Sequence, residues 1–185
     1  EGHCRAGVAA TLKHFPNQGS TVEDPHELDS FSTNTPDDWV EFGSQPYSDT
    51  VAPLVMTGHI RYDSVDDETP ATLSSEIMSW LRDDLGYEGV IVTDDMHVMR
   101  GIGADLLPGE RAVAALRAGA DLALFVGAAN GVEIVDAIIA EAEADPVFAA
   151  HLEESAERIL RLKGALGLIP GTDTEWFEWC GASAE

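Results

Sequence analysis

Four short apolar runs stand out along the chain, each bounded by residues that favour turns. They cover residues 8–15, 52–57, 89–93 and 121–126. The runs are nearly continuous in apolar residues, which is typical of strands buried on both faces of a parallel sheet. A helical or loop segment follows each run, so the pattern predicts repeated strand–helix units of the α/β class.

Helical periodicity is clearest in the second half of the chain. Ser74 is a good candidate for an N-cap, and Gly86 for a residue that ends the helix. Helices are expected near residues 37–42, 73–85, 110–118, 131–144 and 147–166. The segment from residue 28 to residue 50 is polar and carries little further pattern.

Polar residues gather where the predicted strands end. Lys13 and His14 close the first strand, His59 follows the second, and Asp94 and Asp95 follow the third. Functional groups at the carboxyl ends of parallel strands are typical of (β/α)₈ barrels, the TIM-barrel fold. A full barrel needs eight strand–helix units and roughly 250 residues. Only about four units are predicted here, so the expected fold is half of such a barrel.

The bulk composition suits one folded domain. The chain has 185 residues, of which 44% are hydrophobic. We expect a partial barrel over residues 1–170 and an irregular tail over 171–185. Two cysteines, Cys4 and Cys180, lie near opposite ends with no Cys/His cluster around them, so a zinc site is not expected. A disulfide between them is one alternative, and two free thiols are the preferred prediction.

Charge is the unusual global feature. Ten Lys and Arg against 34 Asp and Glu give a net charge of −24, spread along the chain. Such a surface repels nucleic acid and anionic membranes, and no apolar run is long enough to cross a membrane. A salt-adapted source is a reasonable hypothesis. The sequence leaves open whether the protein is cytoplasmic or secreted.

One sequence motif narrows the functions that the chain could have. Residues 13–26 read Lys-His-Phe-Pro-Asn-Gln-Gly-Ser-Thr-Val-Glu-Asp-Pro-His. This resembles the signature of glycoside hydrolase family 3, and more narrowly its β-N-acetylhexosaminidase branch, which reads Lys-His-Phe-Pro-Gly-His-Gly, four residues, then Asp-Ser-His. Here Asn17 and Gln18 replace Gly-His, and Pro25 replaces Ser. The resemblance covers about residues 7–168 and matches the second half of that family's barrel domain.

The resemblance implies roles for three residues in catalysis. The run Gly-Val-Ile-Val-Thr-Asp-Asp-Met resembles the family's nucleophile segment, which makes Asp94 the expected nucleophile. His26 would be the general acid and base, held and polarised by Asp24. From residue types alone, Asp94 could instead cap the next helix, and the Asp24–His26 pair could lie on a solvated loop.

Three further residues would bind the sugar by resemblance. Lys13 and His14 would contact its hydroxyls, and burial of a lysine at a strand end would be costly without such a role. His59 matches a family position at the site. Alternatively, His59 is a core histidine that is hydrogen-bonded to the backbone.

Three functions remain open at this stage. The first is a retaining β-N-acetylhexosaminidase that releases terminal N-acetylglucosamine from glycans or peptidoglycan fragments, with no metal or organic cofactor, or a phosphorylase variant of it. The second is a β-glucosidase of the same family, which would lack the Asp-x-His pair. The third is a non-catalytic sugar-binding fragment. Half a barrel leaves its sheet open, and either a missing N-terminal half or a second copy of the chain would be needed to close it.

Overall fold

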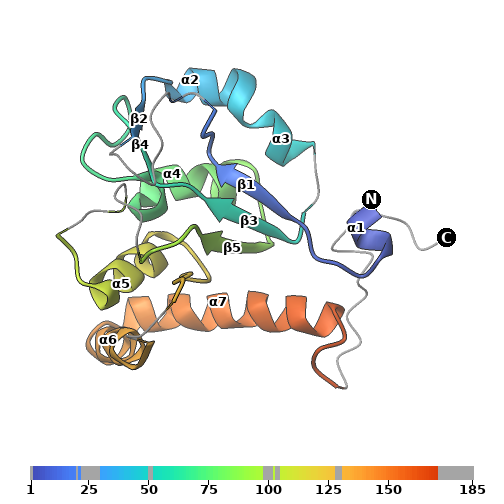
Figure 1. Ribbon diagram of the computed structural model, residues 1–185, viewed down its shortest axis with the longest axis vertical. Helices are drawn as coiled ribbons and strands as arrows, with labels where there is room; N and C mark the ends of the chain where they lie inside the picture. Colours follow the sequence, from blue (N-terminus) through green and yellow to red (C-terminus); the bar gives the residue numbers. More distant parts are fainter. Residues whose placement is uncertain are drawn as a thin grey trace.

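A three-stranded parallel sheet lies at the centre of the protein (Figure 1). The computed structural model describes residues 2–19, 21, 30–49, 52–97, 102, 105–127 and 131–170. The strands are β1 (Thr11–Phe15), β3 (Leu54–Thr57) and β5 (Val90–Thr93), in the order β1-β3-β5. These are three of the four predicted strands, and β3 pairs in parallel with both neighbours.

The fourth predicted strand lies beside β5 but is not a regular strand. Leu122 forms a single parallel bridge with Val92. Beyond it, the Thr93 hydroxyl oxygen accepts a hydrogen bond from the backbone N–H of Leu124, at 2.9 Å. Backbone bonds still join Leu122 to Ile91 and Thr93, but the N–H groups of Leu124 and Val126 bond to side chains. The prediction of a strand over residues 121–126 is therefore wrong in extent although right in position.

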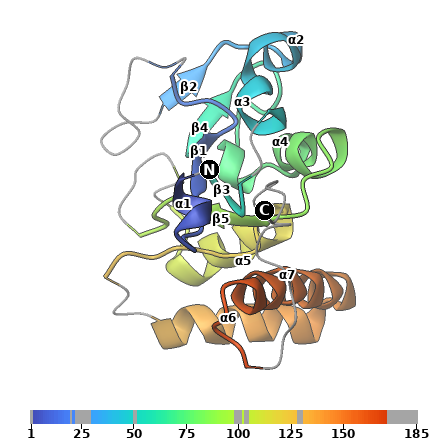
Figure 2. The same cartoon turned by 90° about the vertical axis from the view of Figure 1, so that its right-hand side faces the viewer.

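The predicted helices are present, with ends within a few residues of the expected ones. Two of them, α2 and α4, continue as π-helical turns, η1 and η3. The helical elements are α1 (Gly2–Arg5), α2 (Pro36–Asp38), η1 (Trp39–Gly43), α3 (Gln45–Ser48), η2 (Ala71–Leu73), α4 (Ser75–Ser79), η3 (Trp80–Asp84), α5 (Pro108–Ala118), α6 (Gly131–Ala144) and α7 (Pro146–Ala165). Helices α2 and α3 lie beyond β1, and α6 and α7 lie beyond β5, in both views (Figures 1 and 2).

Side-chain caps explain where two of these helices begin. Thr35 and Asp38 form a reciprocal capping box at the start of α2. The Ser74 hydroxyl accepts a hydrogen bond from the N–H of Ile77 at the start of α4, as predicted. Gly86 follows η3 with a φ of +62°, a left-handed conformation that favours glycine and ends the helix.

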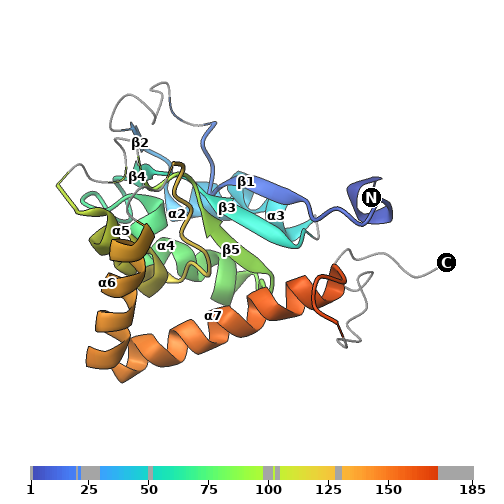
Figure 3. The same ribbon diagram turned by 60° about the horizontal axis from the view of Figure 1, so that its bottom comes forward.

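A second, two-stranded parallel sheet was not predicted. It pairs β2 (Ser30–Ser32) with β4 (Ile60–Tyr62), close to the carboxyl ends of β1 and β3 (Figures 1 and 3). Strands of three residues are too short to show an alternating pattern. Asp24 and His26 precede β2 and lie outside the described residues.

An aromatic cluster joins the first strand to the helices around it. The Phe15 ring packs edge-on against Trp39, with ring centroids 5.2 Å apart. Trp39 in turn stacks on Trp80, at 5.4 Å. Because Phe15 ends β1, this cluster fixes the end of the strand that carries His14 against η1 and η3.

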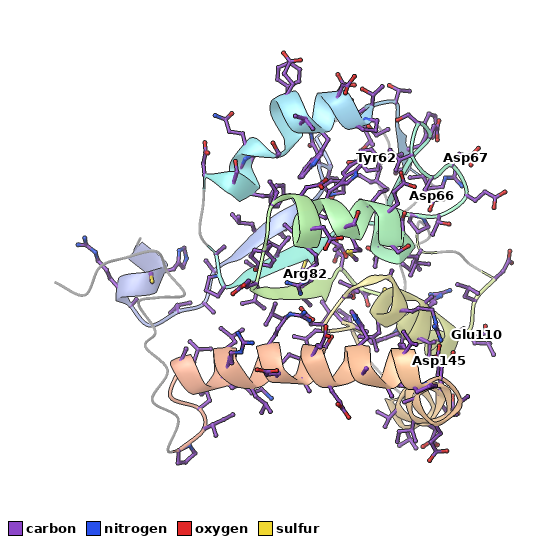
Figure 4. The ribbon with its side chains drawn as sticks, turned by 180° about the vertical axis from the view of Figure 1, so that it is seen from behind. Tyr62, Asp66, Asp67, Arg82, Glu110 and Asp145 are labelled. Atoms are coloured by element: carbon purple, nitrogen blue, oxygen red, sulfur yellow. The ribbon has the colours of Figure 1, made fainter. Side chains whose placement is uncertain are left out.

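A buried ion-pair network holds the last helix against the sheet. The carboxylate of Asp121 has no solvent exposure and pairs with both Arg82 and Arg158. It also accepts a hydrogen bond from the N–H of Ile91, at 2.7 Å. Figure 4 shows Arg82 between α4 and α7. Four segments, namely η3, β5, α7 and the segment after α5, therefore meet at one carboxylate.

Cys4 corrects one expectation. It is disulfide-bonded, so the prediction of a free thiol at this position is wrong. Cys180, the other cysteine of the sequence, lies outside the described residues, as does the whole tail over residues 171–185. The domain boundary at residue 170 stays a prediction.

Replacing Asp121 tests the buried network. We expect Asp121→Asn to lower the free energy of unfolding by about 3–5 kcal/mol, because two arginines would keep their burial and lose their countercharge. Urea denaturation at neutral pH measures this. The control is Arg161→Gln, which breaks an exposed pair with Glu157 and should cost below about 0.5 kcal/mol. Equal small losses in both variants would contradict the account.

Candidate active site

The sheet brings His14 and Asp94 together. His14 lies in β1, after a cis Lys13–His14 peptide bond, and Asp94 directly follows β5. Nε2 of His14 lies 3.1 Å from Oδ2 of Asp94, and their side chains are only 19% and 17% exposed. Two of the predicted site residues, far apart in the sequence, therefore form one partly buried pair at the carboxyl ends of the strands.

Gly58 makes this pairing possible. The strand between β1 and β5 is β3, and the N–H of Gly58 just after it donates to the carbonyl of Phe15, at 2.9 Å. A Cβ at Gly58 would come within 3.2 Å of the Cβ of His14. Because glycine has none, His14 can lie over the end of β3 and reach Asp94 on the far strand.

Asp94 is held in its charged form. A carboxylate only accepts hydrogen bonds, so Nε2 of His14 must carry a proton. This bond lowers the pKa of Asp94 to about 2, against the opposing effect of burial. The backbone N–H of Asp95 adds a second bond, to Oδ1, at 2.8 Å. Asp94 is therefore an anion throughout the physiological pH range.

The neighbouring carboxylate has a different function. Asp95 is 8% exposed, and its Oδ1 accepts hydrogen bonds from the N–H groups of His97 and Val126, at 3.0 and 2.9 Å. These bonds tie the turn after β5 to the segment that follows Leu122. Asp95 thus shapes the backbone, and Asp94 is the carboxylate that faces the site.

His59 is buried and fully engaged by the protein. Its side chain is 1% exposed. Nδ1 lies 2.9 Å from the Thr72 hydroxyl, and Nε2 lies 3.1 Å from the carbonyl oxygen of Asp95. Burial lowers the pKa of His59 to about 4. Of the two readings that the sequence left open, this geometry matches the core histidine bonded to the backbone.

Lys13 differs from expectation in one respect. It is exposed, because β1 is the outer strand of the sheet and its side chains alternate between exposed and half-buried. The argument that a buried lysine must be paired therefore does not apply. A contact between Lys13 and the sugar stays a prediction, and so do the roles of Asp24 and His26, which lie outside the described residues.

Tyr62 is a site-forming residue that sequence reasoning missed. It is buried in β4, and its hydroxyl donates to the carbonyl oxygen of Asn17 in the loop after β1. Figure 4 shows Tyr62 beside the loop that follows β4. Asn17 is one of the two positions at which the motif departs from the family pattern, so the altered loop is anchored to the second sheet.

A cavity of about 520 Å³ lies at the opposite, amino-terminal end of β5. Its walls contain three arginines and three carboxylates, so its charge favours neither anions nor cations; they are Arg82, Arg158, Arg161, Asp83, Glu88 and Glu154. None of the predicted site residues lines it.

Within the described part of the chain, no group of three or more His, Cys, Asp or Glu is placed to hold a metal ion. The same residues include no helix that is long and apolar enough to cross a membrane.

Comparison with known proteins identifies relatives of this chain. The β-hexosaminidase of Thioalkalivibrio sulfidiphilus is 34% identical in an alignment of 197 positions, which covers 99% of this chain and 51% of that protein. The β-N-acetylglucosaminidase/β-glucosidase of Cellulomonas fimi is 32% identical in an alignment of 182 positions, which covers 90% of this chain and 32% of that protein. This chain thus spans about half, or less, of the length of these relatives.

Solved structures agree with the fold. The β-N-acetylhexosaminidase from Beutenbergia cavernae superposes with a TM-score of 0.76 at 35% identity, over 86% of this chain and 48% of that one. A glycoside hydrolase family 3 β-N-acetylglucosaminidase from Paenibacillus superposes with a TM-score of 0.82 at 32% identity, over 95% and 36%. The observed half-barrel therefore corresponds to part of a longer enzyme chain.

The sequence profile of the glycosyl hydrolase family 3 N-terminal domain matches residues 1–162. With this match over most of its length, the chain belongs to glycoside hydrolase family 3.

Proposed function

We propose that this chain carries the nucleophile of a retaining β-N-acetylhexosaminidase, which removes terminal β-linked N-acetylglucosamine from glycans or peptidoglycan fragments. The observation that carries the proposal is the Asp94 carboxylate, ionised, partly exposed and hydrogen-bonded to His14 at the carboxyl end of a central strand. The names of the relatives, β-hexosaminidase and β-N-acetylglucosaminidase, support the choice of sugar.

The first step forms a covalent intermediate. An oxygen of Asp94 attacks the anomeric carbon, and the bond from that carbon to the leaving oxygen breaks. His26, protonated, gives its proton to the leaving oxygen, and Asp24 orients the imidazole. The product of this step is a glycosyl ester on Asp94.

The second step reverses the proton transfer. Neutral His26 removes a proton from water, and the water oxygen attacks the anomeric carbon as the bond to Asp94 breaks. The low pKa of Asp94, about 2, helps here, because a weakly basic carboxylate leaves readily. The same pKa guarantees that the nucleophile is charged when the next substrate binds.

His14 would have two functions in this scheme. Its Nε2–H stabilises the charge of Asp94 in the free enzyme, and together with Lys13 it would contact sugar hydroxyls. His14 is part of the site wall because Gly58 leaves it room. His59, which is 1% exposed, is assigned no sugar contact in this scheme.

A β-glucosidase is the second candidate. The Cellulomonas fimi relative is named for both activities, so the family supports either sugar. The Asp24-x-His26 pair favours the hexosaminidase, since the β-glucosidases of the family lack it. A phosphorylase is disfavoured because a net charge of −24 repels a phosphate acceptor.

We also propose that further β/α units complete the barrel. Strand β1 has one unpaired edge within the described sheet. At the opposite side of the sheet, in the segment beside β5, Leu124 and Val126 are exposed. Helix α6 adds an exposed stripe of Val132, Val135 and Ile139, spaced by three and four residues. The greater length of the relatives supports a missing half as the occupant, and a second copy of this chain is the alternative.

Turnover of an aryl β-N-acetylglucosaminide tests the function. We expect activity in the wild-type chain that Asp94→Asn lowers by about 10³-fold or more, because the nucleophile is lost. Asp105→Asn removes an exposed carboxylate and should leave the activity unchanged. An aryl β-glucoside, compared under the same conditions, should be the poorer substrate. If the folded wild-type chain has no turnover at any salt concentration, the proposal fails for this chain.

The pKa of Asp94 provides a test that needs no substrate. We expect His14→Ala to raise it from about 2 towards its ordinary value of 3.8, since the largest lowering contribution is lost while burial and the bond from the N–H of Asp95 remain. Carboxyl ¹³C NMR during a pH titration measures it, and His97→Ala, an exposed imidazole on the next turn, is the control. Because the folded pKa is the lower one, Asp94 stabilises the protein above about pH 4, and this stability is lost as the pH falls towards 2. An unchanged pKa in His14→Ala would contradict the pairing.

The mass in solution tests the open sheet. We expect the isolated chain to self-associate, and more strongly at 1 M salt, where the Debye length falls to about 3 Å and the negative charges no longer repel. Leu124→Lys with Val126→Lys should reduce association, because charge blocks strand addition at an edge. Val147→Lys, at an exposed position of α7, is the matched control. A monomer at every salt concentration, with a cooperative melt, would show a self-sufficient half-barrel.

A further inference from the structure

A buried cluster of three polar side chains lies directly beneath the turn that presents Asp94. The hydroxyls of Thr57 and Thr72 are 2.8 Å apart, and the Thr72 hydroxyl also contacts Nδ1 of His59, at 2.9 Å. Both threonines are 0% exposed and His59 is 1% exposed. Buried polar groups are costly unless each is bonded, so this cluster needs a reason beyond filling space.

The hydrogen bonds have a definite direction. The carbonyl oxygen of Asp95 can only accept, so Nε2 of His59 must carry a proton. The Thr72 hydroxyl has one proton, and it donates that proton to the carbonyl oxygen of Gly58, at 2.9 Å, while its oxygen lies 2.9 Å from Nδ1 of His59. The Thr72 oxygen in turn accepts from Thr57. Thr72 thus ties the Nδ1 side of the His59 ring to Gly58 and Thr57, while Nε2 on the other side binds the carbonyl oxygen of Asp95.

The bond to Asp95 matters because of what else holds that residue. Its carboxylate is bonded from the other side by the N–H of Val126. The preceding residue, Asp94, donates its own N–H to the carbonyl of Thr57, at 3.1 Å. The turn after β5 is therefore held by β3 on one side and by the segment after Leu122 on the other. His59, two residues after the end of β3, adds a side-chain bond to this turn through the carbonyl oxygen of Asp95.

We propose that His59 and Thr72 are positioning residues: they fix the backbone turn so that the Asp94 carboxylate points at the anomeric carbon. The proposal rests on the proposed glycosidase function. Neither side chain touches the sugar. Both act through the carbonyl of Asp95, and the pair links η2, where Thr72 lies, to the end of β5.

Thr72 gives the sharper test of the two residues. His59 interacts with the charge of Asp94 directly, so replacing His59 would change two things at once. No direct bond joins Thr72 to Asp94 in the described structure, so an effect of its hydroxyl on the nucleophile passes through the groups that it bonds, His59 and Thr57. Thr72→Val removes the hydroxyl at almost constant volume, and Thr72→Ser keeps it.

We expect Thr72→Val to lower kcat by about 10- to 100-fold, as a small misplacement of a reacting group does, with KM changed less than twofold. Thr72→Ser should restore kcat. Ser74→Ala is the matched control, because it removes another buried hydroxyl two residues away, at the cap of α4. It should lower the melting temperature and leave kcat unchanged.

A second measurement does not need activity. Backbone ¹⁵N order parameters of Asp94 and Asp95 should be about 0.85 in the wild type and Thr72→Ser, and fall towards about 0.6 in Thr72→Val. A lower melting temperature with unchanged order parameters, or with equal losses of kcat in Thr72→Val and Ser74→Ala, would overturn the proposal. If the wild type has no turnover, the proposed function fails, and the order parameters still decide whether Thr72 and His59 hold the turn.

Discussion

A single carboxylate without solvent exposure organises the second half of this chain. Asp121 can be buried only because two guanidinium groups and one backbone N–H share its charge. The partners Arg82, Ile91 and Arg158 come from a helix before the strand, the strand itself and the last helix. Burial lowers the pKa of Arg82 while Asp121 opposes that effect. Charge compensation of this kind works at one relative placement of the three elements, so it fixes the position of β5 among its neighbours.

The position of β5 in turn determines the site. In the ladder, Phe15 pairs with Thr57 and Thr57 pairs with Thr93, so the ends of three strands come level. His14, one residue before this level, meets Asp94, one residue after it, and the glycine just after the middle strand leaves room for this contact. Two layers result: His14 and Asp94 face outwards, and His59 with its threonines lies below them. The upper layer provides the reacting groups and the lower layer holds the backbone that carries them.

Most of this architecture could be predicted from the spacing of apolar residues and from the residues that begin or end helices and strands. Buried strands and capped helices such as α4 carry strong local signals, and the resemblance of residues 13–26 to the family pattern added the expected nucleophile, Asp94. Long-range contacts carry no such signal. The pairing of β2 with β4, the bond from Tyr62 to the loop after β1, and the loss of ladder hydrogen bonds after Leu122 depend on partners distant in sequence. Lys13 shows the same limit, because the sequence did not reveal that its strand is the outer one.

The net charge of −24 affects how readily copies of this chain associate through the unpaired edge of the sheet. An unpaired strand edge is a template on which any extended chain can add, including a partly folded copy of the same protein. Electrostatic repulsion between two acidic copies slows their encounter, and the structure of the edge stays the same. Acidification, which neutralises carboxylates, removes this protection while leaving the edge intact. The acidic surface therefore opposes the addition of like copies to the unpaired strand edge, and this opposition weakens as the pH falls.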